Sequence, residues 1–288
     1  MRSSMNRAPR GPVNRKIPFR RLARRLPLYF GVSLLLLVVM FPFLWMLQMS
    51  FRPTQDIFGF RLGFNPTFEH YRALRTGDFP GSFRNSVAAS LSSTALSLLI
   101  GVPAAYSLSR GRFQTRNRIA LWILATRMAP PIAFTIPFFL AYRYLNLHDT
   151  VLGLVFIYLT FNLALVIWMM QTFYDSIPES LEEMAWIDGC SIWGTFCRIT
   201  LPLTAPGLAA TAVLCFIYSW NDFFFSLILT RTKAMTAPVA IVNFMQYEGW
   251  EWGKIAAGGT LVMLPVVVFS FLVRHYLVKG LMAGGLKE

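Results

Sequence analysis

The segment at 174–205 holds the densest group of residues that could bind a partner. It contains five acidic residues and one basic residue, so its formal charge is −4. The acids are Asp175, Glu179, Glu182, Glu183 and Asp188. Carboxylates suit contact with a basic protein surface. They are repelled by the anionic headgroups of a cytoplasmic leaflet and by nucleic-acid phosphates. We therefore interpret the segment as a docking site for a protein partner.

Local signals in this segment predict a short helix, an elbow and a second short helix. Ser176 followed by Glu179 is a capping-box pattern, and Pro178 suits a first helical turn. Gly189 is placed to end the helix at the position after its cap. The second helical stretch runs from about 191 to 199, and Pro202 is expected to break the chain before the next apolar run. Leu181, Met184, Ala185 and Asp188 have the spacing of one helix face.

Polar residues inside apolar runs are the second group of candidates. Arg127 lies just before Pro130 and Pro131, and Asn221 and Asp222 are adjacent near the end of another run. A charge within a membrane costs at least ~2.5 kcal/mol, so each should face a cavity, a partner or the bundle interior. We expect a role in a translocation path or in gating, with helix–helix hydrogen bonding as the alternative.

Catalytic and metal-binding residues are not predicted. The three histidines are scattered, and the three cysteines form no CxxC pair. No Ser/His or His/Asp/Glu constellation indicates an enzyme, and no cofactor is expected on this chain. A phosphate-binding Gly-x-x-x-x-Gly-Lys-Ser/Thr loop is also missing from the sequence, so any ATP hydrolysis must occur on a separate chain.

The elements that must position these residues are membrane helices. Of the 288 residues, 55% are hydrophobic and 14% are charged, whereas soluble domains carry about 25% charged residues. A span needs about 20 mostly apolar residues. Six stretches qualify: 28–50, 86–109, 119–142, 151–173, 206–230 and 257–279. The predicted fold class is an all-α polytopic membrane protein, with the third span kinked by its prolines.

Charge distribution predicts the orientation of these spans. Residues 1–27 carry nine Lys or Arg and no acid, and the segment 110–118 carries four Arg and no acid. Basic segments beside membrane spans stay in the cytoplasm, so both termini are predicted to be cytoplasmic. The loops at 51–85, 143–150 and 231–256 then face outward. The tail 1–27 is expected to be disordered and to bind no nucleic acid, despite the net charge of +14.

The acidic segment resembles the EAA loop of type I ABC-importer permeases. It reads Ser-Leu-Glu-Glu-Met-Ala-Trp-Ile-Asp-Gly-Cys-Ser at 180–191 and Ile-Thr-Leu-Pro-Leu at 199–203. Met184 replaces the first alanine of the family pattern. The carbohydrate branch of the family is also suggested by Asn-Ser at 85–86, Ala-Ala-Tyr-Ser-Leu-Ser-Arg at 104–110 and Trp-Asn-Asp at 220–222. The C-terminal tail reads Gly-Gly-Leu-Lys at 284–287, which departs slightly from the Gly-Ala-Val-Lys-Gly that is usual in the family.

The resemblance implies a permease subunit in the inner or plasma membrane. Its partners would be a second related permease, two ATP-binding cassette subunits and an extracytoplasmic binding protein. The solute would be a sugar or a sugar-like polyol, with disaccharide, polyol, glycerol and sugar phosphate left open. The expected domains are the tail 1–27, the span 28–50, the outer loop 51–85, a core at 86–279 with the loop 174–205, and the tail 280–288.

Residue roles also follow from the resemblance. Glu183 would contact a basic residue of the ATPase, and Ala185 would permit close approach. Gly189 would set the elbow, and Pro202 would fix the chain's return to the membrane. Glu182, Met184 and Asp188 complete the expected ATPase-coupling loop. Two rival functions are a secondary transporter, which would need a visible repeat or paired midplane charges, and a membrane scaffold, which would leave this loop unexplained.

Overall fold

The structure is a computed structural model that describes residues 19–59, 63–111, 113–246 and 249–284. The chain divides into two compact units between Met46 and Leu47. Helix α1 (Phe19–Ser50) makes up the described part of the first unit and ends in the second. The predicted tail 1–27 is helical from Phe19, and its residues 1–18 lie outside the described ranges.

Apolar helices dominate the chain, as predicted. Four are long and apolar enough to cross a membrane: Pro27–Ser50, Phe79–Arg110, Val151–Asp175 and Trp252–Leu272. They belong to α1, α3 (Phe79–Arg110), α6 (Val151–Asp175) and α13 (Trp252–Gly284). Two bent helix pairs bring the number of candidate spans to six if each pair is counted once. Helix α13 continues past the predicted end of the last span at 279, and residues 285–288 of the expected tail 280–288 are outside the described ranges.

The third predicted span is sharply bent. Helix α4 (Arg116–Met128) and the segment formed by η2 (Pro131–Phe134) and α5 (Thr135–Tyr144) meet at 89°. Pro130 and Pro131 supply no backbone N–H at the bend, and Ala129 before them is extended at φ −68° and ψ 131°. The predicted kink is therefore confirmed.

The fifth predicted span is not one continuous helix over 206–230. Helix α10 (Ala205–Trp220) ends at Trp220, and α11 (Phe224–Leu229) follows after a break at 221–223. The other bent pair joins α10 to the run Ile192–Leu203, at 76°. Asn221 and Asp222 lie in this break, and the Asp222 carboxylate accepts hydrogen bonds from the Tyr158 hydroxyl of α6 and from the Ser226 N–H.

Shorter elements lie between these helices. Between α1 and α3 they are η1 (Thr54–Asp56) and α2 (Glu69–Thr76). Helix α12 (Ala237–Val242) lies between α11 and α13. Within the described ranges the only strands are β1 (Met245–Gln246) and β2 (Gly249–Trp250), which pair antiparallel. The acidic segment forms α7 (Glu179–Ile187), α8 (Ile192–Thr195), the π-helical turn η3 (Phe196–Thr200) and α9 (Leu201–Leu203).

Close helix contacts hold the second unit together. A Cβ on Gly101 of α3 would lie 2.7 Å from Val166 of α6, and one on Gly207 of α10 would lie 2.4 Å from the Phe173 ring. In lipid the hydrophobic effect does not drive helices together, so they associate through close packing, and small residues let their backbones approach closely. Helices α3, α6 and α10 therefore form a packed scaffold around a core that includes Met170.

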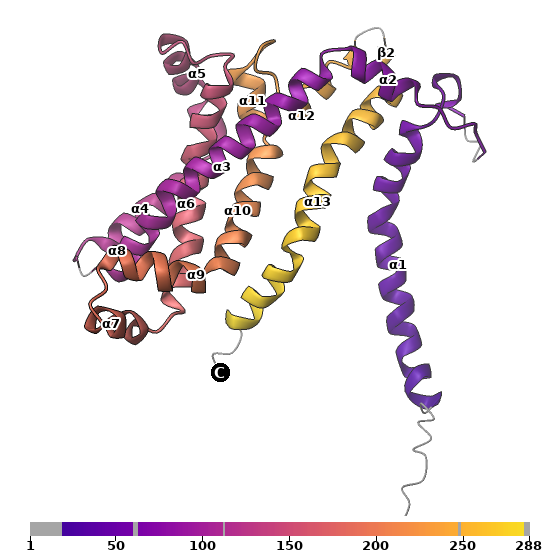
Figure 1. The fold of residues 1–288 in the computed structure, drawn as a ribbon. Coiled ribbons are helices and arrows are strands. Elements are labelled where there is room, and N and C mark those ends of the chain that lie inside the picture. Colours follow the sequence, from indigo (N-terminus) through magenta and orange to yellow (C-terminus); the bar gives the residue numbers. More distant parts are fainter. Residues whose placement is uncertain (1–18, 60–62, 112, 247–248, 285–288) are drawn as a thin grey trace, which may run out of the picture. The chain divides into compact units, whose positions relative to one another are not determined.

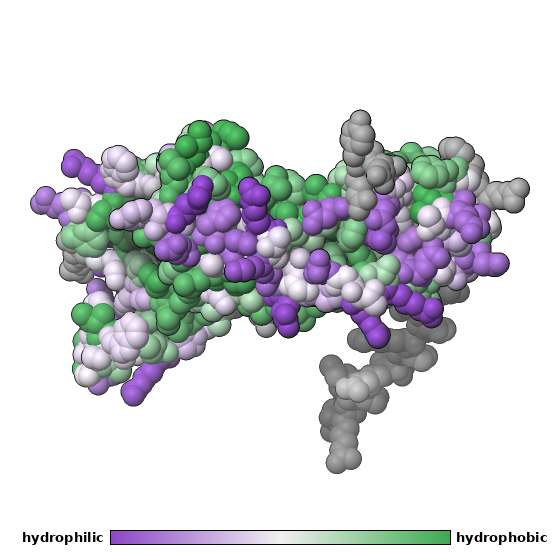
Figure 2. Space-filling model, turned by 90° about the horizontal axis from the view of Figure 1, so that it is seen from above, coloured by the Kyte–Doolittle hydropathy of each residue, from purple (hydrophilic) through white to green (hydrophobic). Residues whose placement is uncertain are grey.

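The second unit has two distinct ends. Helices α7, α8 and α9 lie at one end, and α2, α5, α11 and α12 lie at the other (Figure 1). Viewed onto the end with α5, α11 and α12, hydrophilic residues form a band flanked by hydrophobic ones (Figure 2). The acidic segment and the loops predicted to face outward are thus on opposite ends of the unit.

Candidate functional site

Helix α7 begins at Glu179, but not through the predicted capping box. The Ser176 hydroxyl donates a hydrogen bond to the Phe173 carbonyl at 2.7 Å, and Ser176 caps the end of α6. Pro178 is the N-cap residue and makes no side-chain cap bond. The capping-box prediction is wrong because α6 continues to Asp175, which assigns Ser176 to the preceding helix.

Gly189 ends α7 as predicted. It has φ +87°, a left-handed conformation that glycine adopts without strain. The Gly189 N–H donates to the Trp186 carbonyl at 3.0 Å, and the Cys190 N–H donates to the Ala185 carbonyl at 2.9 Å. This pair of bonds is a Schellman motif, which satisfies carbonyls that the helix end would otherwise leave unpaired.

Glu182 is buried within the chain and is 1% exposed. Its carboxylate accepts hydrogen bonds from the Tyr106 hydroxyl at 2.8 Å, the Arg110 Nε at 3.0 Å and the Thr200 hydroxyl at 3.0 Å. These donors come from α3 and η3, so one carboxylate joins α7 to both. A buried charge with this many partners fixes the position of its helix, and losing a partner is costly.

Arg110 extends the same network to α6. One guanidinium nitrogen donates to the carbonyls of Tyr174 and Ile177, each at 2.9 Å, while its Nε pairs with Glu182. A cation at a helix C-terminus also interacts favourably with the helix dipole. Arg110 therefore ties the end of α3, the end of α6 and the inner face of α7 together.

The two faces of α7 differ from the predicted arrangement. Ala185 is 6% exposed and faces the chain's own interior with Glu182, so neither residue lies on the outer face. Ala185 is therefore not on the exposed face, and its role in the close approach of a partner stays a prediction. Glu183, Met184 and Asp188 are exposed. Their face also carries exposed apolar side chains, with Ile187 at 85%.

Pro202 does not break the chain. It lies in the first turn of α9, inside a helical run that ends at Leu203, and the bend follows at Thr204. Pro202 has no N–H to give to the carbonyl four residues earlier, and the turn before it, η3, widens to a π-helix. The chain therefore turns at Thr204, two residues after the predicted point.

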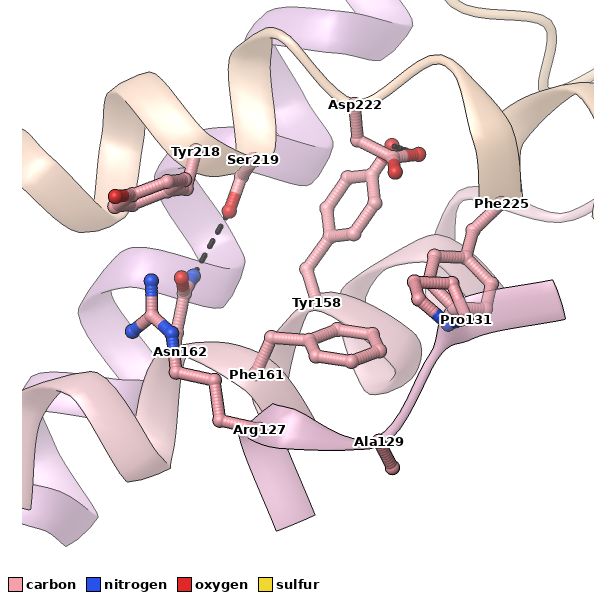
Figure 3. A pocket seen from close by; sticks show the side chains of 10 residues that line it. All are labelled: Arg127, Ala129, Pro131, Tyr158, Phe161, Asn162, Tyr218, Ser219, Asp222 and Phe225. Carbon is pink, nitrogen blue, oxygen red and sulfur yellow. Dashed lines mark hydrogen bonds between the residues drawn. The ribbon is translucent and has the colours of Figure 1, made fainter. Parts of the chain in front are cut away.

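A cavity of about 220 Å³ lies between the two broken helices. It brings together Arg127, Pro131 and Asp222 from the predicted path residues (Figure 3). The Arg127 guanidinium lies 4.8 Å from the centre of the Tyr218 ring, a cation–π contact. Pro130 and Asn221 belong to the adjoining breaks but do not line the cavity.

Polar residues missed by the sequence analysis complete the cavity wall. The Asn162 amide donates to the Ser219 hydroxyl at 2.8 Å, and the Tyr158 hydroxyl donates to Asp222 at 3.1 Å. Asp222 also accepts the Ser226 N–H at 3.0 Å, at the start of α11. An isolated amide in the apolar run at 151–173 was a usable signal for Asn162. Ser219 and the tyrosines carried no such signal.

The described cysteines are free, and no group of three or more His, Cys, Asp or Glu among the described residues could hold a metal ion. Cys215 is buried in the core, whereas Cys197 is exposed.

Comparison with known proteins decides the family. Residues 97–281 match the family described as the binding-protein-dependent transport system inner membrane component. The match covers more than half of the chain and includes the whole acidic segment and both broken helices. The chain belongs to this family. The predicted resemblance is therefore confirmed. The chain is a membrane transport component and not an enzyme.

Relatives of this transport component include two permeases with sugar names. It is 37% identical to the trehalose transport system permease protein SugB of Mycobacterium tuberculosis, over 85% of this chain and 92% of the relative. It is 34% identical to the trehalose/maltose transport system permease protein MalG of Thermococcus litoralis, over 92% and 97%. Among solved structures, a bacterial ABC transporter involved in alginate import matches with a TM-score of 0.73 at 23% identity, covering 93% of this chain and 99% of that one.

An outer clasp, defined here as Asp149 with the backbone of 231–234, orders the end of the permease opposite α7. The Asp149 carboxylate accepts N–H groups from Arg231 at 2.9 Å, Ala234 at 3.1 Å, Lys233 at 3.1 Å and Thr232 at 3.3 Å. Partial burial alone would raise the pKa of Asp149, but these donors outweigh it and lower that pKa to about 2.

The residues Asn85 and Ser86 support the same loop. The Asn85 amide donates to the Lys233 carbonyl at 2.9 Å, and the Ser86 hydroxyl accepts the Ala237 N–H at 2.8 Å. The sequence analysis uses this pair only as part of the resemblance to the family. Its contacts give it a structural role, which is to fasten the start of α3 to the loop before α12.

Proposed function

We propose that this chain is a permease subunit of an ATP-driven, binding-protein-dependent importer of a sugar or a sugar-like polyol. Family membership supports the transport role. The trehalose and maltose names of the relatives support the solute class. The observation that carries the coupling role is the two-faced helix α7. Its inner face is anchored by buried Glu182, and its outer face is exposed and both acidic and apolar.

The outer face of α7 suits a groove on a cytoplasmic ATPase. Glu183 and Asp188 would meet basic groups there, while Met184 and Ile187 would bury apolar surface. Glu182, Ala185, Gly189 and Pro202 would serve the same contact indirectly, by holding and shaping the helix.

Force on α7 would reach the membrane helices through the buried network. Glu182 bonds to Arg110 and Tyr106 of α3, and Arg110 bonds to the end of α6. When ATP binding draws two ATPase subunits together, α7 and this scaffold would rotate as one body between inward-open and outward-open states. The two breaks at Pro130 and Asn221 would let the outer parts of the path change shape, and Arg127, Pro131 and Asp222 would line that path.

The full importer would contain this chain, a second related permease, two ATP-binding cassette subunits and an extracytoplasmic binding protein. Both termini would be cytoplasmic in the inner or plasma membrane. The basic segments at 1–27 and 110–118 support that orientation. The binding protein would then approach the end that carries the outer clasp.

Charge reversal on α7 tests the coupling role. Glu183→Lys should abolish co-purification of the ATPase subunit and reduce ATP-dependent sugar uptake at least tenfold, because a charge-assisted contact becomes repulsive. Asp56→Lys is the matched control, since Asp56 is exposed in the predicted outer loop. Uptake that persists in Glu183→Lys with an intact ATPase complex would contradict the proposal.

A further inference from the structure

The cavity beside Arg127 lies where two helix breaks meet. One wall comes from the bend between α4 and η2, another from the break between α10 and α11, and α6 supplies the third (Figure 3). Non-helical backbone at membrane depth is tolerated where it faces protein or a cavity. Broken membrane helices commonly build solute sites for this reason.

Hydrogen-bonding capacity in this cavity is not used up by the protein. Within the described part of the chain, the Arg127 guanidinium makes neither a hydrogen bond nor an ion pair, and its contact is the Tyr218 ring. The Tyr158 hydroxyl and the Ser226 N–H both donate to Oδ2 of Asp222, and a carboxylate has about four acceptor sites.

We propose that this cavity binds one neutral pyranose ring of the transported solute, an inference that rests on the proposed function. Arg127 would donate to ring hydroxyl oxygens, Asp222 would accept from hydroxyl groups, and the Tyr218 or Phe161 ring would cover an apolar C–H face. Each of these side chains lines the cavity. A sugar hydroxyl both donates and accepts, so it can use both charged residues at once.

Charge and size set the class of ligand. One guanidinium and one carboxylate line the cavity, so its formal charge is zero and a phosphate or carboxylate gains no net electrostatic attraction there. Pockets for drug-sized molecules measure about 300–1,000 Å³, and this one measures about 220 Å³. The cavity therefore suits one sugar ring, and a disaccharide would place its second ring outside.

Equilibrium binding tests the site without transport. The full chain in nanodiscs, with no ATP and no binding protein, would be studied by saturation-transfer NMR with methyl α-D-glucopyranoside as the probe. Binding is expected. Arg127→Gln should weaken it about tenfold, because hydrogen bonds from a charged donor are lost. Arg143→Gln is the matched control, since Arg143 stacks on Phe139 outside the cavity and should leave binding unchanged.

Three outcomes would overturn the site. They are no binding of the probe, equal binding by Arg127→Gln, or tighter binding of glucose 6-phosphate than of the neutral probe. Asp222→Asn adds a second variant that keeps the shape of the side chain, and its thermal midpoint reports whether α11 is still capped. ATP-dependent sugar uptake alongside a failed binding test would reject this site alone, whereas uptake that needs no ATPase would reject the importer function itself.

Discussion

Glu182 and Glu183 are neighbouring carboxylates with opposite surroundings. The first is enclosed by Tyr106, Arg110 and Thr200, and the second is exposed. Adjacent positions on a helix point about 100° apart, so burial of one leaves the other free for a partner. The anchor and the proposed contact are therefore separate residues, and separate substitutions can test them.

Removal of the Glu182 charge should loosen the cytoplasmic end of the permease. Glu182→Gln leaves Arg110 buried without its counter-charge, and breaking such a pair typically costs about 3–5 kcal/mol. We expect a clear fall in the thermal unfolding midpoint of the purified protein. Glu183→Gln, the matched change on the exposed face, should leave that midpoint unchanged. Equal midpoints for the two variants would show that the buried network does not hold α7.

The outer clasp should depend on pH. The pKa of Asp149 falls from its ordinary 3.8 to about 2 in the folded protein. Its stabilising effect is therefore complete above about pH 4 and is lost as the pH falls from there to 2. Amide hydrogen exchange at 231–234, corrected for the intrinsic effect of pH, should speed up across this window. Asp149→Asn should exchange quickly at every pH, and a pH-independent wild type would contradict this account.

Residue roles were predictable only where neighbours in sequence decide them. Gly189 ends α7 because its own conformation requires a residue without a side chain. The burial of Glu182 depends on Arg110, which lies 72 residues earlier in the chain. The spacing of residues within the motif cannot predict that partner. Of the four residues with the spacing of one face, Leu181, Met184 and Asp188 are exposed and Ala185 is buried, which the spacing alone could not predict.

At the scale of elements, hydropathy located the membrane helices but not all of their breaks. The bend at Pro130 was predictable because proline removes a hydrogen bond. The break at Asn221 was not, since the apolar run continues on both sides and Asp222 acquires its role from Tyr158, 64 residues away. Tertiary contacts, not local sequence, end α10 there.

The elbow after α7 gives a test at this scale. Gly189 has open space around its missing Cβ, so substitution changes backbone conformation alone. Gly189→Ala should lower the free energy of unfolding of the permease by about 1 kcal/mol, because the alanine Cβ is strained at a positive φ. Asparagine tolerates this conformation better, and Gly189→Asn should cost clearly less.

A thermal shift series would measure both variants. Gly81→Ala is the control, because Gly81 also has open space around it but lies within the helix α3, where alanine is favoured. Equal costs for alanine and asparagine at 189 would mean that the left-handed elbow is not retained in the protein.

At the scale of the whole chain, the two-ended second unit would separate the proposed energy input from the proposed solute entry. Helix α7 lies at one end, and the outer clasp and the broken halves α5 and α11 lie at the other (Figure 1). The proposed sugar site lies between the two breaks. If α7 is the coupling helix, motion there would reach the other end through α3, α6 and α10, which pack together.

Cysteine accessibility tests this orientation in the membrane. Cys197 is exposed near α7, and Cys215 is buried in the core. In a variant that keeps Cys197 alone, a membrane-impermeant maleimide should leave intact cells unlabelled and should react after permeabilisation. Phe58→Cys in a cysteine-free background is the control for the opposite side, because Phe58 is exposed in the first predicted outer loop and should react in intact cells. Labelling of Cys197 from outside would reverse the topology and put α7 beyond the reach of any cytoplasmic ATPase, whereas a variant that keeps Cys215 alone should stay unlabelled under both conditions.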